Sequence, residues 1–279
     1  GRAIKQFTWR ESAITNEAIF QDRGVGDNSV KQAMAFTARG NTLYYQGDSG
    51  EIRVLNQQSK VLEQSFSTEW RSPSEDLLVS ADERWLARYN GYQLEVVNLE
   101  EQATHLIINS PHAIYALALA DKLGLVFAGD EMGAITAYDM NSGEKIWTSP
   151  FQQAAVRDIT LFDNQQKLVH TGKHFSLRDT RDGSLLSEFS FDDAQPIKAF
   201  VDEAKQQLVG MTRRMPKANG ENLRYQLQTI DLASGELLEQ SDNERLIAYA
   251  NEGNTYLTQQ AGDGASSYHF TDRHSGEQR

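Results

Sequence analysis

Ser49 is the first residue in the chain whose neighbours suggest reactivity. It lies in Gly47-Asp48-Ser49-Gly50, a serine flanked by an acid and by glycines. Nucleophilic catalysis by serine also requires a histidine base and an acid that orients this base. Here the four residues connect two short apolar stretches, and Glu51-Ile52 begins the second of them. We therefore interpret Ser49 as a turn residue and not as a nucleophile.

The histidines and acids do not form the patterns of a metal site. There is no HExxH motif, and Gly172 separates the two histidines that lie four residues apart, His170 and His174. The acidic clusters lack the D-x-D-x-D-G loop of a calcium site, and the chain has no cysteine. We predict no catalytic residue, no cofactor and no metal, and expect structural or surface roles for the six histidines, which are His105, His112, His170, His174, His269 and His274.

A short cationic segment is the most distinctive local feature. Residues 212–222 hold three cations, Arg213, Arg214 and Lys217, and one acid, in a chain of formal net charge −12. Surface loops often carry function, and Met215 adds an apolar side chain to the charged ones. We predict that Arg213, Arg214, Met215 and Lys217 contact an acidic protein partner. The alternative is a surface insertion without a function. Such an insertion is tolerated because the entropic cost of closing a loop grows only slowly with its length.

Composition narrows the classes of partner. A pI near 5.0 argues against nucleic acid or an anionic membrane as the general partner, because both require a basic surface. No run of 18 apolar residues occurs, so we expect no membrane insertion by this segment. The chain begins with Gly1-Arg2 and not with Met, which is compatible with a removed signal or lipid anchor. The 12 Phe, 10 Tyr and 4 Trp residues are sufficient for a sizeable core.

The elements that must position these residues repeat along the chain. Six five-residue segments begin with an apolar residue and end with Asn or Asp, and these ends lie 42, 41, 40, 52 and 41 residues apart. Four of them continue into a Ser-Gly or Asp-Gly turn, at Gly143, Gly183, Gly235 and Gly276. The longest interval contains the cationic segment. The six segments are residues 52–56, 94–98, 135–139, 175–179, 227–231 and 268–272.

Further strand candidates surround each segment. In the third copy, residues 114–120 and 124–128 precede it and residues 145–147 follow its turn, while no stretch has a convincing helical period. Four short strands in about 40 residues describe one blade of a β-propeller. The sequence therefore predicts an all-β fold of four-stranded antiparallel blades.

The third copy also carries a family resemblance. Residues 127–144 resemble WD-repeat sequence, and Ala137, Asp139, Gly143 and Trp147 match the A-x-D-x-x-x-G-x-x-x-W pattern of quinoprotein-like propellers. Only this copy has the strand-end tryptophan, and no copy has a Trp-Asp pair. Within the repeat we expect Asp139 to bond the amides of the turn and Trp147 to pack between blades.

The number of blades follows from the count of strands. We predict a single propeller domain over residues 1–279, in which residues 30–279 hold the repeats and residues 1–29 close the ring. The last copy supplies three strands, so we expect residues 13–20 to provide its fourth, with residues 4–9 as an additional strand or as part of a degenerate seventh blade. The count gives six blades, and the habit of propeller families leaves seven open.

Function is less determined than fold, because one fold hosts many functions. We expect a monomeric, non-enzymatic scaffold that binds protein partners through rigidly held loops. One alternative is a bacterial-envelope protein similar to the quinoprotein-like lipoproteins of outer-membrane assembly, and a periplasmic or outer-membrane location is slightly favoured over the cytoplasm. Another is a propeller enzyme or small-ligand binder with a site in the central channel.

Overall fold

The computed structural model describes most of the chain. The described residues are 2–10, 13–22, 34–36, 42–47, 49–56, 59, 61–70, 74–191, 194–215, 224–242, 244–250, 255–261, 266–272 and 277–278. Contacts divide the chain into two units, Gly1–Val126 with Tyr138–Glu144, and Phe127–Ala137 with Lys145–Arg279. The boundary falls within the third four-stranded sheet, so each unit is described by itself.

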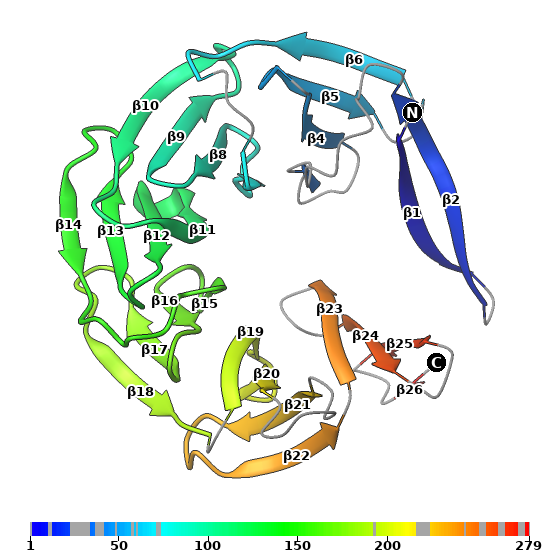
Figure 1. Cartoon of the computed structure of the whole chain (residues 1–279), viewed down its shortest axis with the longest axis vertical. Helices are drawn as coiled ribbons and strands as arrows, with labels where there is room; N and C mark the ends of the chain where they lie inside the picture. Colours follow the sequence, from blue (N-terminus) through cyan, green and yellow to red (C-terminus); the bar gives the residue numbers. More distant parts are fainter. Residues whose placement is uncertain are drawn as a thin grey trace. The chain divides into compact units, whose positions relative to one another are not determined.

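The described residues form six four-stranded antiparallel sheets, numbered 1 to 6 here in chain order (Figure 1). In each sheet the strands lie side by side in the order of the sequence. A 3₁₀ helix, η1 (Asp121–Leu123), joins two strands of sheet 3. The strands are β3 (Met34–Phe36), β4 (Thr42–Gln46), β5 (Ile52–Asn56) and β6 (Val61–Phe66) in sheet 1; β7 (Asp76–Val79), β8 (Trp85–Asn90), β9 (Gln93–Asn98) and β10 (Ala103–Asn109) in sheet 2; β11 (Ile114–Ala120), β12 (Leu125–Asp130), β13 (Ile135–Asp139) and β14 (Lys145–Thr148) in sheet 3; β15 (Ile159–Phe162), β16 (Lys167–His170), β17 (Phe175–Asp179) and β18 (Leu185–Phe189) in sheet 4; β19 (Ala194–Asp202), β20 (Gln207–Arg214), β21 (Arg224–Asp231) and β22 (Leu237–Asp242) in sheet 5; and β23 (Glu244–Ala250), β24 (Thr255–Ala261), β25 (Ser266–Asp272) and β26 (Glu277–Gln278) in sheet 6.

One prediction about the ends of the chain is wrong. Residues 13–20 do not complete the last sheet: they lie in β2 (Ala13–Asp22), which pairs with β1 (Arg2–Arg10) in a separate two-stranded sheet. The fourth strand of sheet 6 is β26. A hairpin joined by two residues loses far less chain entropy than a pairing between the two ends of the chain, which favours the local partner.

The core lies between successive sheets. In the first unit, Ile52 of sheet 1 packs against Leu77, Leu86 and Val97 of sheet 2. Inner strands such as β12 are buried along their whole length, whereas outer strands such as β6 and β22 are largely exposed. An inner strand is covered on both faces, which explains its nearly continuous apolar sequence.

The second unit repeats this packing. Phe175 and Leu177 of sheet 4 share a cluster with Leu208 and Ile230 of sheet 5. On its other face, sheet 5 packs Met211 and its neighbours against Leu246 of sheet 6. Sheet 5 thus buries both faces, which fixes the direction in which successive side chains point along its inner strands.

A buried ion pair within sheet 2 is hydrogen-bonded to the turn before β5 of sheet 1. Arg88 Nε donates to Glu95 Oε2 at 2.6 Å, and neither side chain is exposed. The other nitrogens of the guanidinium donate to the carbonyls of Gly50 and Trp70 and to the hydroxyl of Thr68. Burial of this pair is tolerated because every side of the guanidinium is hydrogen-bonded.

The repeated turn has the geometry expected from the sequence. Asp139 Oδ1 accepts hydrogen bonds from the amides of Asn141 and Ser142 at 2.9 and 2.8 Å, and Gly143 has a φ of +73°. Asp231 makes the same bonds to Ala233 and Ser234. These bonds lower the pKa of both Asp139 and Asp231, because turn amides favour the ionised carboxylate. The predicted role of Asp139 is confirmed.

Candidate partner-binding site

The predicted binding residues lie at the end of the longest hairpin of sheet 5. Arg213 and Arg214 belong to strand β20, where the sequence suggested a loop, and Met215 follows them with 60% of its surface exposed. Lys217 lies outside the described residues. The insertion therefore lengthens the hairpin: β20 and β21 have 8 residues each, against 4 and 5 in β16 and β17 of sheet 4.

Two arginines face each other across this hairpin. The register of β20 and β21 pairs Arg214 with Arg224, and both residues are exposed. Directly opposed residues have Cβ atoms about 4.5–5.5 Å apart, a distance at which like charges destabilise a sheet. Two guanidinium groups at this spacing can both donate to one anion.

A second pair of arginines lies on the other face of the hairpin. Arg213 pairs with Tyr225 in the register, and its Nη2 donates to Gln195 Oε1 at 2.7 Å. Its buried Nε has no hydrogen-bond partner. From sheet 6, Arg245 stacks its guanidinium over the Tyr225 ring, 4.6 Å from the ring centroid. We call Arg213, Arg214, Arg224 and Arg245 the arginine cluster.

Sequence reasoning missed half of this cluster. Arg224 lies just beyond the cationic segment, and Arg245 lies in the next sheet. The sequence signal for Arg224 was its place on the far side of a long hairpin, but its pairing with Arg214 depends on the strand register. For Arg245 the only signal was an arginine at the start of the next strand.

The cluster is suited to anion recognition. A guanidinium presents its N–H groups as a rigid fork that matches a carboxylate or a phosphate, and it stays charged at any physiological pH. Of the acids near the cluster, Asp242 accepts from Gln226 Nε2 at 2.7 Å and Glu244 is buried. The four cations thus form a positive area in an acidic protein.

The other residues with chemical potential are held in structural contacts. Ser49 Oγ donates to the carboxylate of Glu51, which Arg53 also binds, and Gly50 closes the turn on Gly47. This agrees with the interpretation of Ser49 as a turn residue. Within the described ranges, no group of three or more His, Asp or Glu side chains is placed to hold a metal ion.

His170 is buried beside a cation. Its Nδ1 donates to the carbonyl of Thr171 at 3.1 Å, and its Nε2 accepts from Arg178 Nε at 3.1 Å. Burial, together with the positive charge of Arg178, lowers the pKa of His170 to about 3. The ring is therefore neutral at physiological pH and has a structural role.

Solved structures resemble the chain over most of its length. Hydrazine synthase of Kuenenia stuttgartiensis matches with a TM-score of 0.69 at 12% identity, over 90% of this chain and 79% of that one. The computationally designed protein Ika8 matches with a TM-score of 0.64 at 18% identity, over 85% of this chain and 69% of that one. These similarities support a propeller architecture. The chain has a β-propeller-like fold.

In this propeller-like fold the arginine cluster lies at the end of the β20–β21 hairpin of sheet 5, with Arg245 added from β23 of sheet 6. No family model matches the chain, and no curated protein sequence does. No helix in the described part of the chain is long and apolar enough to cross a membrane. What the chain binds must therefore be argued from its own side chains.

Proposed function

We propose that the protein is a non-enzymatic scaffold that binds an acidic segment of a protein partner through the arginine cluster. The observation that carries this proposal is the opposed pair Arg214 and Arg224 at the end of a lengthened hairpin. Two guanidinium groups this close together can both donate to one carboxylate, or to neighbouring carboxylates of one segment.

The surroundings favour an extended acidic segment over a small anion. Arg213 and Arg245 lie on one face of the hairpin and Arg214 and Arg224 on the other, so the cations are spread over its end. Exposed Met215 and the ring of Tyr225 add apolar area for side chains between the acids. The strands hold these groups in place, so the side chains lose little conformational entropy on binding.

The proposal includes the architecture that presents the site. We propose that the six sheets are the blades of one ring of the WD-repeat or quinoprotein-like type, with a seventh blade built on β1 and β2 as the alternative. The repeated Asp-x-x-x-Gly turns and the Trp147 contact between neighbouring sheets support this assignment.

Binding of a defined acidic peptide tests the function. The probe is a fluorescein-labelled peptide of alternating Glu and Ser, measured by fluorescence anisotropy at low and physiological salt. We expect R214E/R224E to bind at least about tenfold more weakly than the unmodified protein, because two favourable charges become repulsive. Binding should also weaken with salt.

A charge-matched variant controls for the general effect of net charge. Lys145 and Arg181 are exposed residues in sheets 3 and 4, and K145E/R181E changes the net charge by the same amount as R214E/R224E. This control should bind nearly as the unmodified protein does. Equal loss in both variants, or no loss in either, would contradict the proposed site. Robust turnover on glycoside, lactone or peptide panels would contradict the non-enzymatic role.

A further inference from the structure

At position 187, sheet 4 lacks the large side chain that covers the turn glycine of the following sheet in sheets 2 and 3. In sheets 2 and 3, the outer strand places a large side chain against the turn glycine of the following sheet. A Cβ added to Gly143 would lie 3.0 Å from Leu106 Cδ1, and one added to Gly183 would lie 2.5 Å from Trp147 Cε3. Leu106 and Trp147 therefore cover these turns closely.

Sheet 4 has a serine at the equivalent place. Trp147 comes four residues after Gly143, and Ser187 comes four residues after Gly183. The register agrees, since Leu106 pairs with Val96 and Ser187 with Leu177, each two residues before the Asn or Asp that starts the turn. A Cβ added to Gly235, the turn glycine of sheet 5, would lie 3.4 Å from Phe189 Cε1, and among the described residues no other side chain comes within 4 Å of it.

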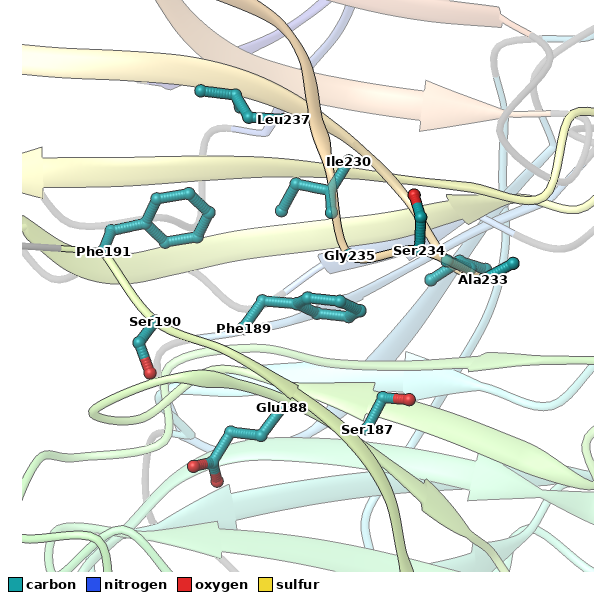
Figure 2. Close-up of a pocket in the computed structure, with 11 residues that line it drawn as sticks. Ser187, Glu188, Phe189, Ser190, Phe191, Ile230, Ala233, Ser234, Gly235 and Leu237 are labelled. Atoms are coloured by element: carbon teal, nitrogen blue, oxygen red, sulfur yellow. The ribbon is translucent and has the colours of Figure 1, made fainter.

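An open groove of about 580 Å³ lies at this position. Figure 2 shows Phe189, Ile230 and Leu237 around it, with Ala233, Ser234 and Gly235 along one side, while the side chain of Glu188 points away. Its volume falls within the range of about 300–1,000 Å³ typical of ligand sites. Leu237 of β22 lines the groove and is 44% exposed.

The repeat also identifies which residue of sheet 5 corresponds to the hydrogen-bond partner of Trp147. Trp147 Nε1 donates at 3.0 Å to the carbonyl of Thr180, the residue directly after Asp179. The equivalent residue in sheet 5 is Leu232, which follows Asp231 and lines the groove. Phe189 has no N–H group with which to occupy that carbonyl. The groove thus combines aromatic and aliphatic side chains with polar groups, and Leu232 is at the position of the residue whose carbonyl accepts from Trp147 one sheet earlier.

We propose that this groove binds an indole ring, the tryptophan side chain of a partner segment. The ring lies against Gly235 as that of Trp147 lies against Gly183, and its N–H donates to the carbonyl of Leu232. Phe189, Phe191 and Leu237 supply the surrounding apolar contacts. The site is separate from the arginine cluster and does not depend on the function proposed for it.

The probe is N-acetyl-L-tryptophanamide, titrated into protein with labelled Ile and Leu methyl groups and followed by NMR. We expect saturable shifts at Ile230, Leu232 and Leu237, with a dissociation constant of about 1–10 mM for so small a ligand. The 1-methylindole analogue, which cannot donate, should bind at least about threefold more weakly. Absence of shifts, or saturable shifts confined to other sheets, overturns the proposal.

Variants of β18 and β22 test whether the probe binds in the groove or elsewhere on the surface. S187W should occupy the groove, raise the melting temperature and abolish the shifts. L186W adds the same side chain at an exposed neighbouring position and should leave binding intact. L237K, at a position 44% exposed, should weaken binding without unfolding the protein and gives a second test if S187W folds poorly. Unchanged binding in both S187W and L237K contradicts the site.

Discussion

His170 donates from Nδ1 to the carbonyl of Thr171 and accepts at Nε2 from Arg178. These two bonds require the neutral ring, since a protonated imidazole would direct an N–H at a guanidinium N–H. The unfolded chain binds a proton at this histidine near pH 6.5, whereas the folded protein does so only near pH 3. This histidine therefore contributes stability that is present above pH 6.5 and is lost as pH falls toward 3.

We predict that H170Q removes this pH dependence. A single proton contributes a slope of at most about 1.4 kcal/mol per pH unit. The unmodified protein should be the more stable of the two at pH 7, and its advantage should shrink as pH falls to 4. Urea unfolding of both proteins at pH 7, 6, 5 and 4 measures the difference. A difference that stays constant over this range would show that His170 is not held neutral.

The repeated turns of neighbouring sheets differ in how closely a side chain covers the turn glycine. Gly183 and Gly235 occupy the same turn position with φ values of +72° and +74°, but Trp147 covers Gly183 closely and only Phe189 approaches Gly235. Both glycines avoid the strain that a side chain has in this left-handed conformation. The two positions differ in the space above them, and substitutions can separate the two effects.

We predict that G183A destabilises the protein more than G235A does. Both variants suffer the same backbone strain, and G183A in addition forces the indole away, which costs about 1–3 kcal/mol more. Denaturant unfolding of the two variants gives this difference directly. Equal losses of stability would mean that Trp147 can move aside freely, and would weaken the case for an underfilled junction beside Ser187.

The opposed arginines of the β20–β21 hairpin allow a prediction about the stability of the protein. Replacing Arg224 by Gln should raise the free energy of unfolding by about 0.2–1 kcal/mol at low salt, because the repulsion across β20 and β21 is removed. The gain should fade in high salt, where exposed charges are screened. R181Q, at an exposed arginine in a turn, is the control and should show little gain. A loss of stability in R224Q would show that the opposed pair is not repulsive.

The turn elements could be predicted from sequence, and the arginine pairing could not. Asp139 and Gly143 recur in other copies with the spacing of a turn, and Trp147 matches the covering position of a known blade pattern, so their roles could be predicted from the sequence. Register across a long hairpin is set by where both strands begin, and Arg224 follows eight residues outside the described ranges.

The last strand and the groove were missed for related reasons. β26 has only 2 residues, too few to show a period, so an N-terminal strand was expected in its place. The sequence shows that the strand-end tryptophan is confined to one copy. Its consequence beside Ser187 depends on where the turn of the following sheet lies.

For the whole molecule, six four-stranded sheets with the same order of strands are the basis for the proposed ring. Electron microscopy of the purified protein tests the number of blades. We predict class averages with six lobes when the particle is viewed along the ring axis. Seven lobes would assign β1 and β2 to a further blade, and an open arc would contradict ring closure.

The central claim is that the end of the β20–β21 hairpin binds an acidic segment. Hydrogen–deuterium exchange with and without a saturating alternating Glu-Ser peptide locates the contact on the intact protein. We predict slower exchange at the amides of Arg213, Arg214, Arg224 and Tyr225, with sheets 1 and 2 unchanged. Binding of the peptide without protection of these amides, or with protection centred on another sheet, would contradict the account.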